Sequence, residues 1–310
     1  MCKSISTLGM EREEWLRLRK GGIGGSDAGA VCGLNPYSSP MSVYWDKTTD
    51  ELDLRDNEAM RQGRDLEEYV ARRFTEETGL KVRRSNKMYW SEEYPFMYAD
   101  VDRLIVGEDA GLECKTVSVY HADKWKDGAI PEHYLIQCFH YMIVTGKRAW
   151  YIAAVILGQG FVYSKIHWDL EFAERLIALE EDFWNHHVQA RKIPNPNGSE
   201  SCNAVLDKYF HESKKEGAVP IPEDIEEKLD RRQDISEEMK RLEKEKTQIE
   251  QEVKIFMDGH GEANNERYRI IWQEIDSERL DTRMLKQEQP EVYRKYVKSS
   301  RNSRFTIKAA

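Results

Sequence analysis

The sequence predicts an α/β protein that carries a helical extension in its C-terminal third. Short apolar runs around glycine-containing turns indicate β-hairpins at residues 102–117 and 149–166. Apolar residues at helical spacing indicate amphipathic helices between and beside these runs, as at residues 57–78. Residues 221–258 are instead dominated by charged side chains, with apolar residues alternating four and three apart, which is typical of a coiled coil or a long helical hairpin.

The composition limits the classes of function that fit. The chain has 310 residues, 33% of them charged, and a formal net charge of −9, so any contact with nucleic acid must come from local basic patches. The segment before Trp15 lacks the apolar core of a signal peptide, and the apolar run 149–157 is too short to span a bilayer. Five scattered cysteines argue against a zinc site or disulfide framework. We therefore expect a cytoplasmic protein with no membrane partner.

Glycine, proline and capping residues set the expected order of elements. Helices are expected at residues 11–20, 41–48, 57–78, 132–145 and 171–192. Strands are expected at residues 87–90, 102–106, 112–117, 149–157 and 161–166. The domain boundary is expected in the loop 194–201, which separates residues 1–200 from an extension, residues 201–310, with a long charged helix and a basic β tail. In that tail, residues 268–272 read as a strand whose possible partner is residues 304–308.

Three ionisable residues are predicted to converge on the first hairpin. Glu113 and Lys115 lie two apart on one strand and so share a face, while Asp102 lies near Glu113 on the partner strand. Carboxylate oxygens suit Mg²⁺ or Mn²⁺, which keep open positions for water and phosphate. Lys115 would orient or deprotonate that water, or hold the developing charge. The pattern indicates metal-assisted phosphodiester hydrolysis, although Glu-x-Lys on a strand is more often an exposed, solvated face.

A glycine-rich segment, residues 21–31, indicates a loop that opens into a helix of small residues with Ser26 as its N-cap. Free amides at the helix start, the Ser26 hydroxyl and the nearby Arg19 would form a phosphate site. The alternative is a tightly packed turn whose glycines only permit close approach. Glycine loops alone favour this second interpretation.

The end of the chain combines basic and aromatic side chains, whereas the chain as a whole is acidic. Such a segment suits a groove that follows a nucleic-acid strand, with cations for phosphates and rings for bases. The alternative is the solvated face of a small sheet formed with residues 268–272. Both interpretations concern the same residues, namely Tyr293, Arg294, Lys295, Tyr296, Lys298, Arg301, Arg304, Phe305 and Lys308.

Five short motifs occur in order across roughly residues 15–184, over half of the chain. Together they resemble the lambda-exonuclease-like (YqaJ-type) viral recombinase family, within the PD-(D/E)xK nuclease superfamily. The motifs are Leu18-Arg19-x-Gly21-Gly22-Ile23-Gly24-Gly25-Ser26-Asp27, Gly63-Arg64-x-Leu66-Glu67, Asp102-Arg103-Leu104, Leu112-Glu113-Cys114-Lys115-Thr116 and Tyr134-x-x-Gln137-x-x-x-Tyr141. No single motif is strong, and the specificity lies in their order and spacing.

The resemblance implies a role for each matching residue. Arg103 departs from the family pattern, because many relatives have glycine after the aspartate, and Asp100 on the same strand face remains an alternative ligand. The implied roles are metal ligation by Asp102, Glu113 and the Cys114 carbonyl, catalysis by Lys115, completion of the acidic site by Glu67, a position near the scissile phosphate for Gln137, and contacts to DNA or its 5′-phosphate by Arg19, Ser26 and Tyr134.

The resemblance implies a restriction-endonuclease-like core, a central mixed sheet flanked by helices, followed by the helical extension. The implied activity is Mg²⁺-dependent exonuclease action on double-stranded DNA, with Mn²⁺ able to substitute, to resect the 5′ strand in phage or prophage recombination. The implied partners are double-stranded DNA ends, a single-strand annealing recombinase and other copies of the chain in a trimer. Two alternatives stay open, an endonuclease or nickase that uses the same site, and a catalytically idle DNA-binding or assembly module.

Overall fold

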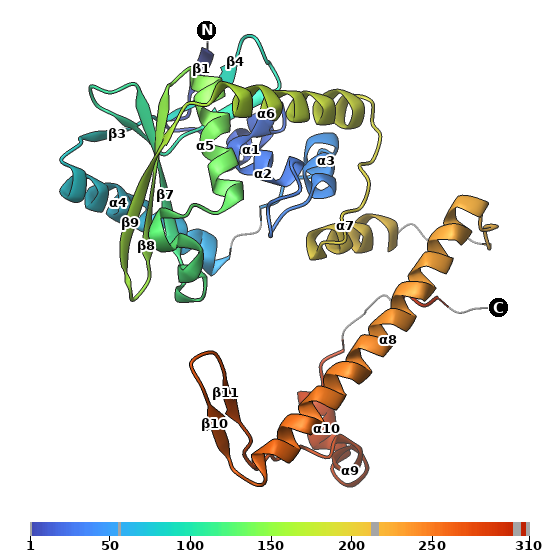
Figure 1. Cartoon of the computed structure of the whole chain (residues 1–310). Helices are drawn as coiled ribbons and strands as arrows, with labels where there is room; N and C mark the ends of the chain where they lie inside the picture. Colours follow the sequence, from blue (N-terminus) through green and yellow to red (C-terminus); the bar gives the residue numbers. More distant parts are fainter. Residues whose placement is uncertain (1, 55–56, 212–216, 300–304, 308–310) are drawn as a thin grey trace. The chain divides into compact units, whose positions relative to one another are not determined.

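The protein is described from a computed structural model that covers residues 2–54, 57–211, 217–299 and 305–307 (Figure 1). Contacts within the chain define two compact units, Met1–Ser213 and Lys214–Ala310. Helix α7 (Glu200–His211), which the sequence did not predict, packs on α3 (Pro40–Thr48) of the first unit. There the ring of Tyr209 stacks on Trp45 with centroids 4.2 Å apart. The boundary therefore follows α7 and does not precede it.

The first unit is built on a mixed sheet with the strand order β3-β6-β7-β8-β9. Strands β7 and β8 are parallel, and the other neighbours are antiparallel. The two expected hairpins are confirmed as β6–β7 and β8–β9. The strands are β3 (Val82–Arg84), β6 (Arg103–Ile105), β7 (Ala110–Val117), β8 (Ala149–Ile156) and β9 (Gly160–His167).

Helices cover both faces of this sheet (Figure 1), as the predicted α/β class requires. On one face, α4 (Glu58–Thr78) buries Val70 and Phe74 against Leu112 of β7. On the other face, α5 (Glu132–Thr145) packs against β8 and belongs to the larger core cluster. Because side chains alternate along a strand, Leu112 faces α4 and its neighbours in β7 face α5.

A second sheet has the strand order β1-β4-β5-β2 and brings the start of the chain beside residues 87–100. Only β4 was predicted; the remaining strands are short or begin at the chain end, where periodicity is weak. Strand β5 leads directly to Asp102, so this sheet fixes the entry to the first hairpin. The strands are β1 (Cys2–Ser6), β2 (Ile23–Gly24), β4 (Lys87–Ser91) and β5 (Met97–Asp100).

The remaining helices of the first unit depart from expectation at three places, one of which is η1, a helix that the sequence did not predict. Helix α2 begins at Gly25 with Gly24 as its N-cap, so the prediction of Ser26 as N-cap is wrong. The Gly24 amide instead donates to the side chain of Asp27 at 3.0 Å. The expected helix 171–192 continues past α6 as a π-helical turn, η2. These elements are α1 (Arg12–Arg19), α2 (Gly25–Val31), η1 (Val119–Gly128), α6 (Leu170–Phe183) and η2 (Trp184–Gln189).

The second unit contains the long charged helix α8 (Glu223–Met257), which confirms the helix expected there. Its apolar seam residues, such as Met239 and Ile249, are exposed, and their pairing in a coiled coil stays a prediction. The hairpin after α8 corrects the expected pairing of residues 268–272, because β11 pairs with β10. The ends of the proposed partner, Arg304 and Lys308, lie outside the described residues, and residues 305–307 form no strand. The elements are β10 (Glu262–Asn264), β11 (Arg269–Ile271), α9 (Thr282–Glu288) and α10 (Pro290–Tyr296).

Among the described residues, none of the helices combines the length and the apolar character needed to cross a bilayer.

Two glycine-to-alanine substitutions test the packing of the sheet. A Cβ at Gly111 would overlap the fully buried indole of Trp150, so Gly111→Ala is expected to destabilise the fold by about 1–3 kcal/mol. Gly63, inside α4, has open space around its missing Cβ, so Gly63→Ala is expected to stabilise by about 0.5–1 kcal/mol. Urea denaturation followed by circular dichroism measures both, and equal effects of the two would contradict the packing described.

Candidate active site

Glu113 and Lys115 lie side by side on β7 and face α5. Glu113 is only 3% exposed. Its Oε1 lies 2.6 Å from Lys115 Nζ and accepts a hydrogen bond from Gln137 Nε2 at 2.8 Å. Lys115 Nζ also donates to Gln137 Oε1 at 3.0 Å. The shared face that the alternation predicts is therefore present, but it is a buried face and not a solvated one.

One oxygen of this buried cluster is left over. Glu113 Oε2 is buried and has no hydrogen-bond partner within the part of the chain that the structure describes. A buried carboxylate oxygen without a donor is unfavourable by several kcal/mol in an apolar medium, by order of magnitude. Such an atom is the kind of donor that a hard divalent cation takes.

Asp102 approaches Glu113 from the corner between β5 and β6. Its Oδ2 accepts a hydrogen bond from the Cys114 amide at 2.8 Å, which fixes it across from β7. Burial raises the pKa of Asp102 well above its usual value, and the negative charges of Glu113 and Glu67 raise it further. Burial lowers the pKa of Lys115, but the charges of Glu113, Tyr134 and Asp102 and the Glu113 hydrogen bond together outweigh burial, so the net shift of the pKa is upward.

Asp100, the alternative ligand, is held differently. Its Oδ2 accepts a hydrogen bond from the indole N–H of Trp15 at 2.7 Å. Burial raises its pKa, whereas the Trp15 hydrogen bond and the charge of Arg19 lower it. The charge of Glu113 raises the pKa of Asp102, whereas the carboxylate that raises the pKa of Asp100 is Glu67. Both aspartates line the same cavity, and Asp102 is the one that the Glu113 charge affects.

Glu67 reaches the site from α4, but it forms an ion pair with Arg103 that offsets its charge. The Arg103 side chain, 2% exposed, pairs with Glu67 and lies 3.0 Å from Glu68. It also donates to the carbonyl of Asp102 at 2.8 Å. The residue that departs from the family pattern is thus a buried counter-ion that ties α4 to the Asp102 corner. The apolar spacing of the sequence gave no sign that Arg103 is buried.

Helix α5 supplies the opposite wall of the site. Gln137 Nε2 donates to Tyr141 Oη at 2.9 Å as well as to Glu113. The Tyr134 ring lies under Lys115, with Nζ 4.4 Å from the ring centroid. Tyr134 therefore lies behind Lys115, and neither of them, nor Cys114, is among the residues that line the cavity described below.

Arg19, the last residue of α1, and Ser26, in the first turn of α2, contact each other. Arg19 Nη2 donates to Ser26 Oγ at 2.9 Å, and its guanidinium lies 4.9 Å from the Trp15 ring. A Cβ at Gly25 would overlap the Tyr141 ring, so this glycine permits close approach of α2 to α5. The close-approach interpretation of the glycine segment is therefore confirmed for Gly25, while the phosphate site at Arg19 and Ser26, which line a cavity, stays a prediction.

A single cavity of about 360 Å³ brings most of these groups together. Arg84, Asp100 and Arg103 also line it, beside residues that the sequence singled out. Trp15, Asp27, Arg103 and Tyr141 contact the predicted residues, and they had not been assigned roles. The lining residues that were predicted are Arg19, Ser26, Glu67, Asp102, Glu113 and Gln137.

The donor set of the site fits a hard divalent cation that keeps several water ligands. In the described residues, no group of three or more His, Cys, Asp and Glu side chains forms a metal-binding cluster. The expected set has two carboxylates, Asp102 and Glu113, and one carbonyl, from Cys114. Mg²⁺ is bound in proteins by one or two carboxylates, with water and phosphate oxygens completing its shell. The unpartnered oxygen of Glu113 supports this fit.

Comparisons with known proteins agree on one family and one fold. A family model described as the YqaJ-like viral recombinase domain matches residues 14–148. The protein YqaJ of Bacillus subtilis (strain 168) is 36% identical over 302 residues, which cover 96% of this chain and 95% of the relative. An alkaline exonuclease from Laribacter hongkongensis, LHK-Exo, is 18% identical and covers 65% of this chain and 100% of its own, with a TM-score of 0.50. The same exonuclease in complex with dAMP gives a TM-score of 0.51. The two solved structures show that the chain shares the fold of this exonuclease.

The charge repulsion at Asp102 leads to a stability prediction. A carboxylate whose pKa is raised in the folded state lowers stability progressively as the pH rises from its unfolded pKa to its folded pKa. Asp102→Asn removes the charge but keeps an oxygen for the Cys114 amide, so at pH 7.5 in EDTA the variant is expected to be more stable, by about 1 kcal/mol. The difference should shrink toward acidic pH, because the native carboxyl then binds a proton.

Urea denaturation at several pH values measures this effect. Asp109→Asn is the matched control, because that carboxylate lies in the exposed turn of the same hairpin. A loss of stability in Asp102→Asn at pH 7.5 would show that the Asp102 charge is satisfied in the fold without a cation.

Proposed function

We propose that this chain, which belongs to the YqaJ-like viral recombinase family, is a divalent-metal-dependent exonuclease that degrades double-stranded DNA from its ends. The observation that carries the proposal is the buried Glu113 carboxylate, with one oxygen unpartnered among the described residues, beside Asp102 and Lys115. A binding module has no use for such an arrangement, because a buried and repelling pair of acids destabilises a fold. The family and the fold are those expected for such an enzyme.

The residues of the site divide the chemistry between them. Asp102, Glu113 and the Cys114 carbonyl would hold Mg²⁺, or Mn²⁺ in its place. When bound, the cation lowers the pKa of its water ligand and offsets charge on the phosphate. The Lys115 ammonium, held by Glu113 and Gln137, would orient that water and offset charge that develops on the phosphate. Gln137 fixes Glu113 and Lys115 relative to each other, because its amide group forms a hydrogen bond with each of them.

End recognition is the finer part of the proposal. Arg19 and Ser26 line the same cavity as the acidic pair, so a phosphate bound between them would place the end of a strand beside the metal site. A guanidinium and a hydroxyl suit a terminal phosphate because both can donate to its oxygens. We therefore propose resection of the 5′ strand of a DNA duplex.

Incubation with linear and closed circular DNA, with and without Mg²⁺, tests the activity. Linear DNA should be degraded only with the metal, and closed circular DNA should persist. Asp102→Ala and Glu113→Ala should abolish cleavage without unfolding the protein, because each removes a metal oxygen and little packing. Asp109→Ala, in the exposed turn of the same hairpin, should leave the rate unchanged. Cleavage of the circle would favour an endonuclease, and loss of activity in Asp100→Ala with normal turnover in Asp102→Ala would reassign the ligand.

The terminal-phosphate assignment has its own test. Linear duplex with a 5′-phosphate should be digested faster than the 5′-hydroxyl form, and Arg19→Ala should erase the difference. The loss expected for a charge-assisted contact is about tenfold or more. Arg17→Ala is the control, because Arg17 lies on the same helix with its side chain 71% exposed and pairs only weakly with Glu13 at 3.7 Å. Equal rates on both substrates in the unmutated protein would return the glycine segment to a purely structural role.

A further inference from the structure

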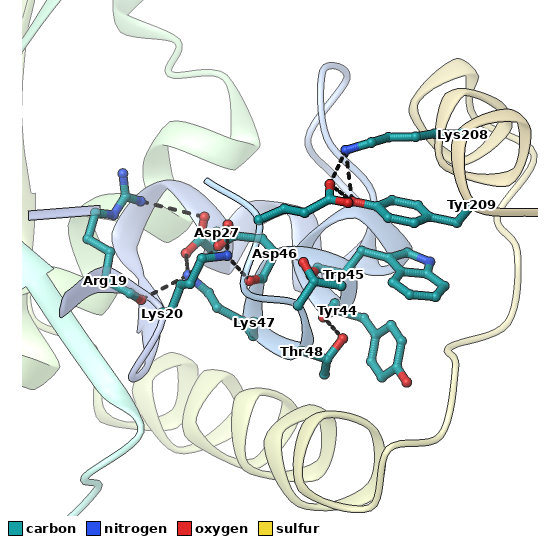
Figure 2. Close-up of polar contacts among 12 residues, drawn as sticks. Arg19, Lys20, Asp27, Tyr44, Trp45, Asp46, Lys47, Thr48, Lys208 and Tyr209 are labelled. Atoms are coloured by element: carbon teal, nitrogen blue, oxygen red, sulfur yellow. Dashed lines mark hydrogen bonds and ion pairs between the residues drawn. The ribbon is translucent and has the colours of Figure 1, made fainter. Parts of the chain in front are cut away.

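A buried lysine lies behind Arg19 and outside the groups discussed so far. Lys47, on α3, has a side chain only 1% exposed. Its Nζ lies 2.9 Å from Asp27 Oδ2 and 3.0 Å from Asp46 Oδ2, and donates to the carbonyl of Arg19 at 3.1 Å. Figure 2 shows these side chains in one continuous series of polar contacts that also includes Lys20.

A lysine is an unfavourable choice for this position if its role is packing alone. The neighbouring residues of α3, Met41, Val43 and Tyr44, are buried and apolar, and a methionine would fill the same volume. Burying an ammonium ion is unfavourable by several kcal/mol, by order of magnitude, unless partners offset it. Lys47 meets that condition through the two carboxylates and the carbonyl that surround it.

Asp27 connects Lys47 to the cavity. Its Oδ1 lies 3.6 Å from Arg19 Nη2, and its Oδ2 accepts from the Gly24 amide at 3.0 Å. Asp27 also follows Ser26 directly, so fixing Asp27 fixes the turn that presents the Ser26 hydroxyl to Arg19. One carboxylate therefore holds both groups that the proposed function assigns to the terminal phosphate.

The same contacts set the charge of the pocket. Asp27 alone would neutralise Arg19 and repel an incoming phosphate. Burial raises the pKa of Asp27, but Lys47 and Arg19 together outweigh burial, so the pKa lies well below its usual value and Asp27 is ionised. Two cations, Arg19 and Lys47, contact the single carboxylate of Asp27, which leaves one positive charge in excess beside the cavity. Asp46, which does not line the cavity, is also paired with Lys20.

We propose that Lys47 is a positioning residue for the terminal phosphate. Acting through Asp27, it holds the Arg19 guanidinium and the Ser26 hydroxyl toward the cavity and offsets the carboxylate charge, so that Arg19 remains free to attract a phosphate. Lys47 does not line the cavity and so does not touch the DNA. This inference rests on the proposed assignment of Arg19 and Ser26 to a 5′-phosphate.

Binding without cleavage tests the inference in the full-length protein. The dissociation constants of two short duplexes, one with a 5′-phosphate and one with a 5′-hydroxyl, are measured in EDTA, and their ratio is the preference for phosphate. Lys47→Met should reduce this ratio about tenfold, the effect of one charge-assisted contact, with affinity for the 5′-hydroxyl duplex nearly unchanged. Lys20→Met should retain the ratio, because Lys20 contacts Asp46 and not Asp27.

A second variant covers the case in which Lys47→Met fails to fold. Asp27→Asn/Lys47→Met removes both buried charges and leaves an oxygen for the Gly24 amide. It should fold and prefer the 5′-phosphate more strongly than Lys47→Met does, because the uncompensated carboxylate is gone. A folded double variant with no preference, where the unmutated protein has one, would contradict the charge-offsetting role.

The outcomes separate this inference from the proposed function. A folded Lys47→Met that keeps the native ratio, or that weakens both duplexes equally, would make Lys47 a structural strut between α2 and α3. An unmutated protein without any preference would overturn this inference together with the phosphate assignment. Metal-dependent cleavage of linear DNA would stand in either case, because it depends on Asp102 and Glu113.

Discussion

The parallel pairing of β7 with β8 is the constraint on which the site depends. Eight residue pairs, from Ala110–Ala149 to Val117–Ile156, place β7 in the interior with helices on both of its faces. A strand in that place has no solvated face, so Glu113 must be buried wherever the register is kept. The acid is therefore held in the core by the hydrogen bonds of the backbone, and its own interactions follow from that placement.

Most charges brought into the interior by this arrangement have a partner on a neighbouring element. Arg103 offsets Glu67 between β6 and α4, and Lys47 offsets Asp27 between α3 and α2. At Asp102 and Glu113, two carboxylates share a single lysine, and one Glu113 oxygen lacks a partner in the described residues. Glu180 also has a buried oxygen without a partner there, although its other oxygen lies 2.9 Å from His140. What distinguishes Asp102 and Glu113 is the added repulsion between two neighbouring carboxylates, which a cation would remove.

The sequence predicted the elements whose periodicity is long and regular, and it failed where contacts at a distance decide. Helix α4 and the hairpin around Glu113 follow from apolar spacing and turn residues within a few positions. Strand β5 and helix α7 were not predicted, because tertiary packing determines that they pair with β4 and α3.

Within the site, alternation placed Glu113 and Lys115 on one face, but it gave no sign that this face is buried. The ligand pair and the lysine were proposed from the hairpin, and Arg19 with Ser26 from the glycine segment; motif order then favoured these interpretations over the structural alternatives. Buried counter-ions such as Arg103 carry no periodic signal, because a single charged residue in an apolar run reads as a solvated one.

Helix α5 links the two halves of the site. His140 lies 2.9 Å from Glu180 of α6 and 2.8 Å from the carbonyl of Tyr98 in β5, so α5 is fixed to elements beyond its own sheet. From this helix, Gln137 reaches Glu113, and Tyr141 lies against Gly25 of α2. Because Gly25 has no side chain, α2 packs directly on the ring of Tyr141, whose hydroxyl accepts the hydrogen bond from Gln137. The spacing between the Arg19 end of the cavity and its acidic end is thus set by direct contact between rigid elements. In the proposed exonuclease, that spacing would determine which phosphodiester lies at the metal when a terminal phosphate is held. The packing of Gly25 against Tyr141 would then set how far from the strand end each cleavage occurs.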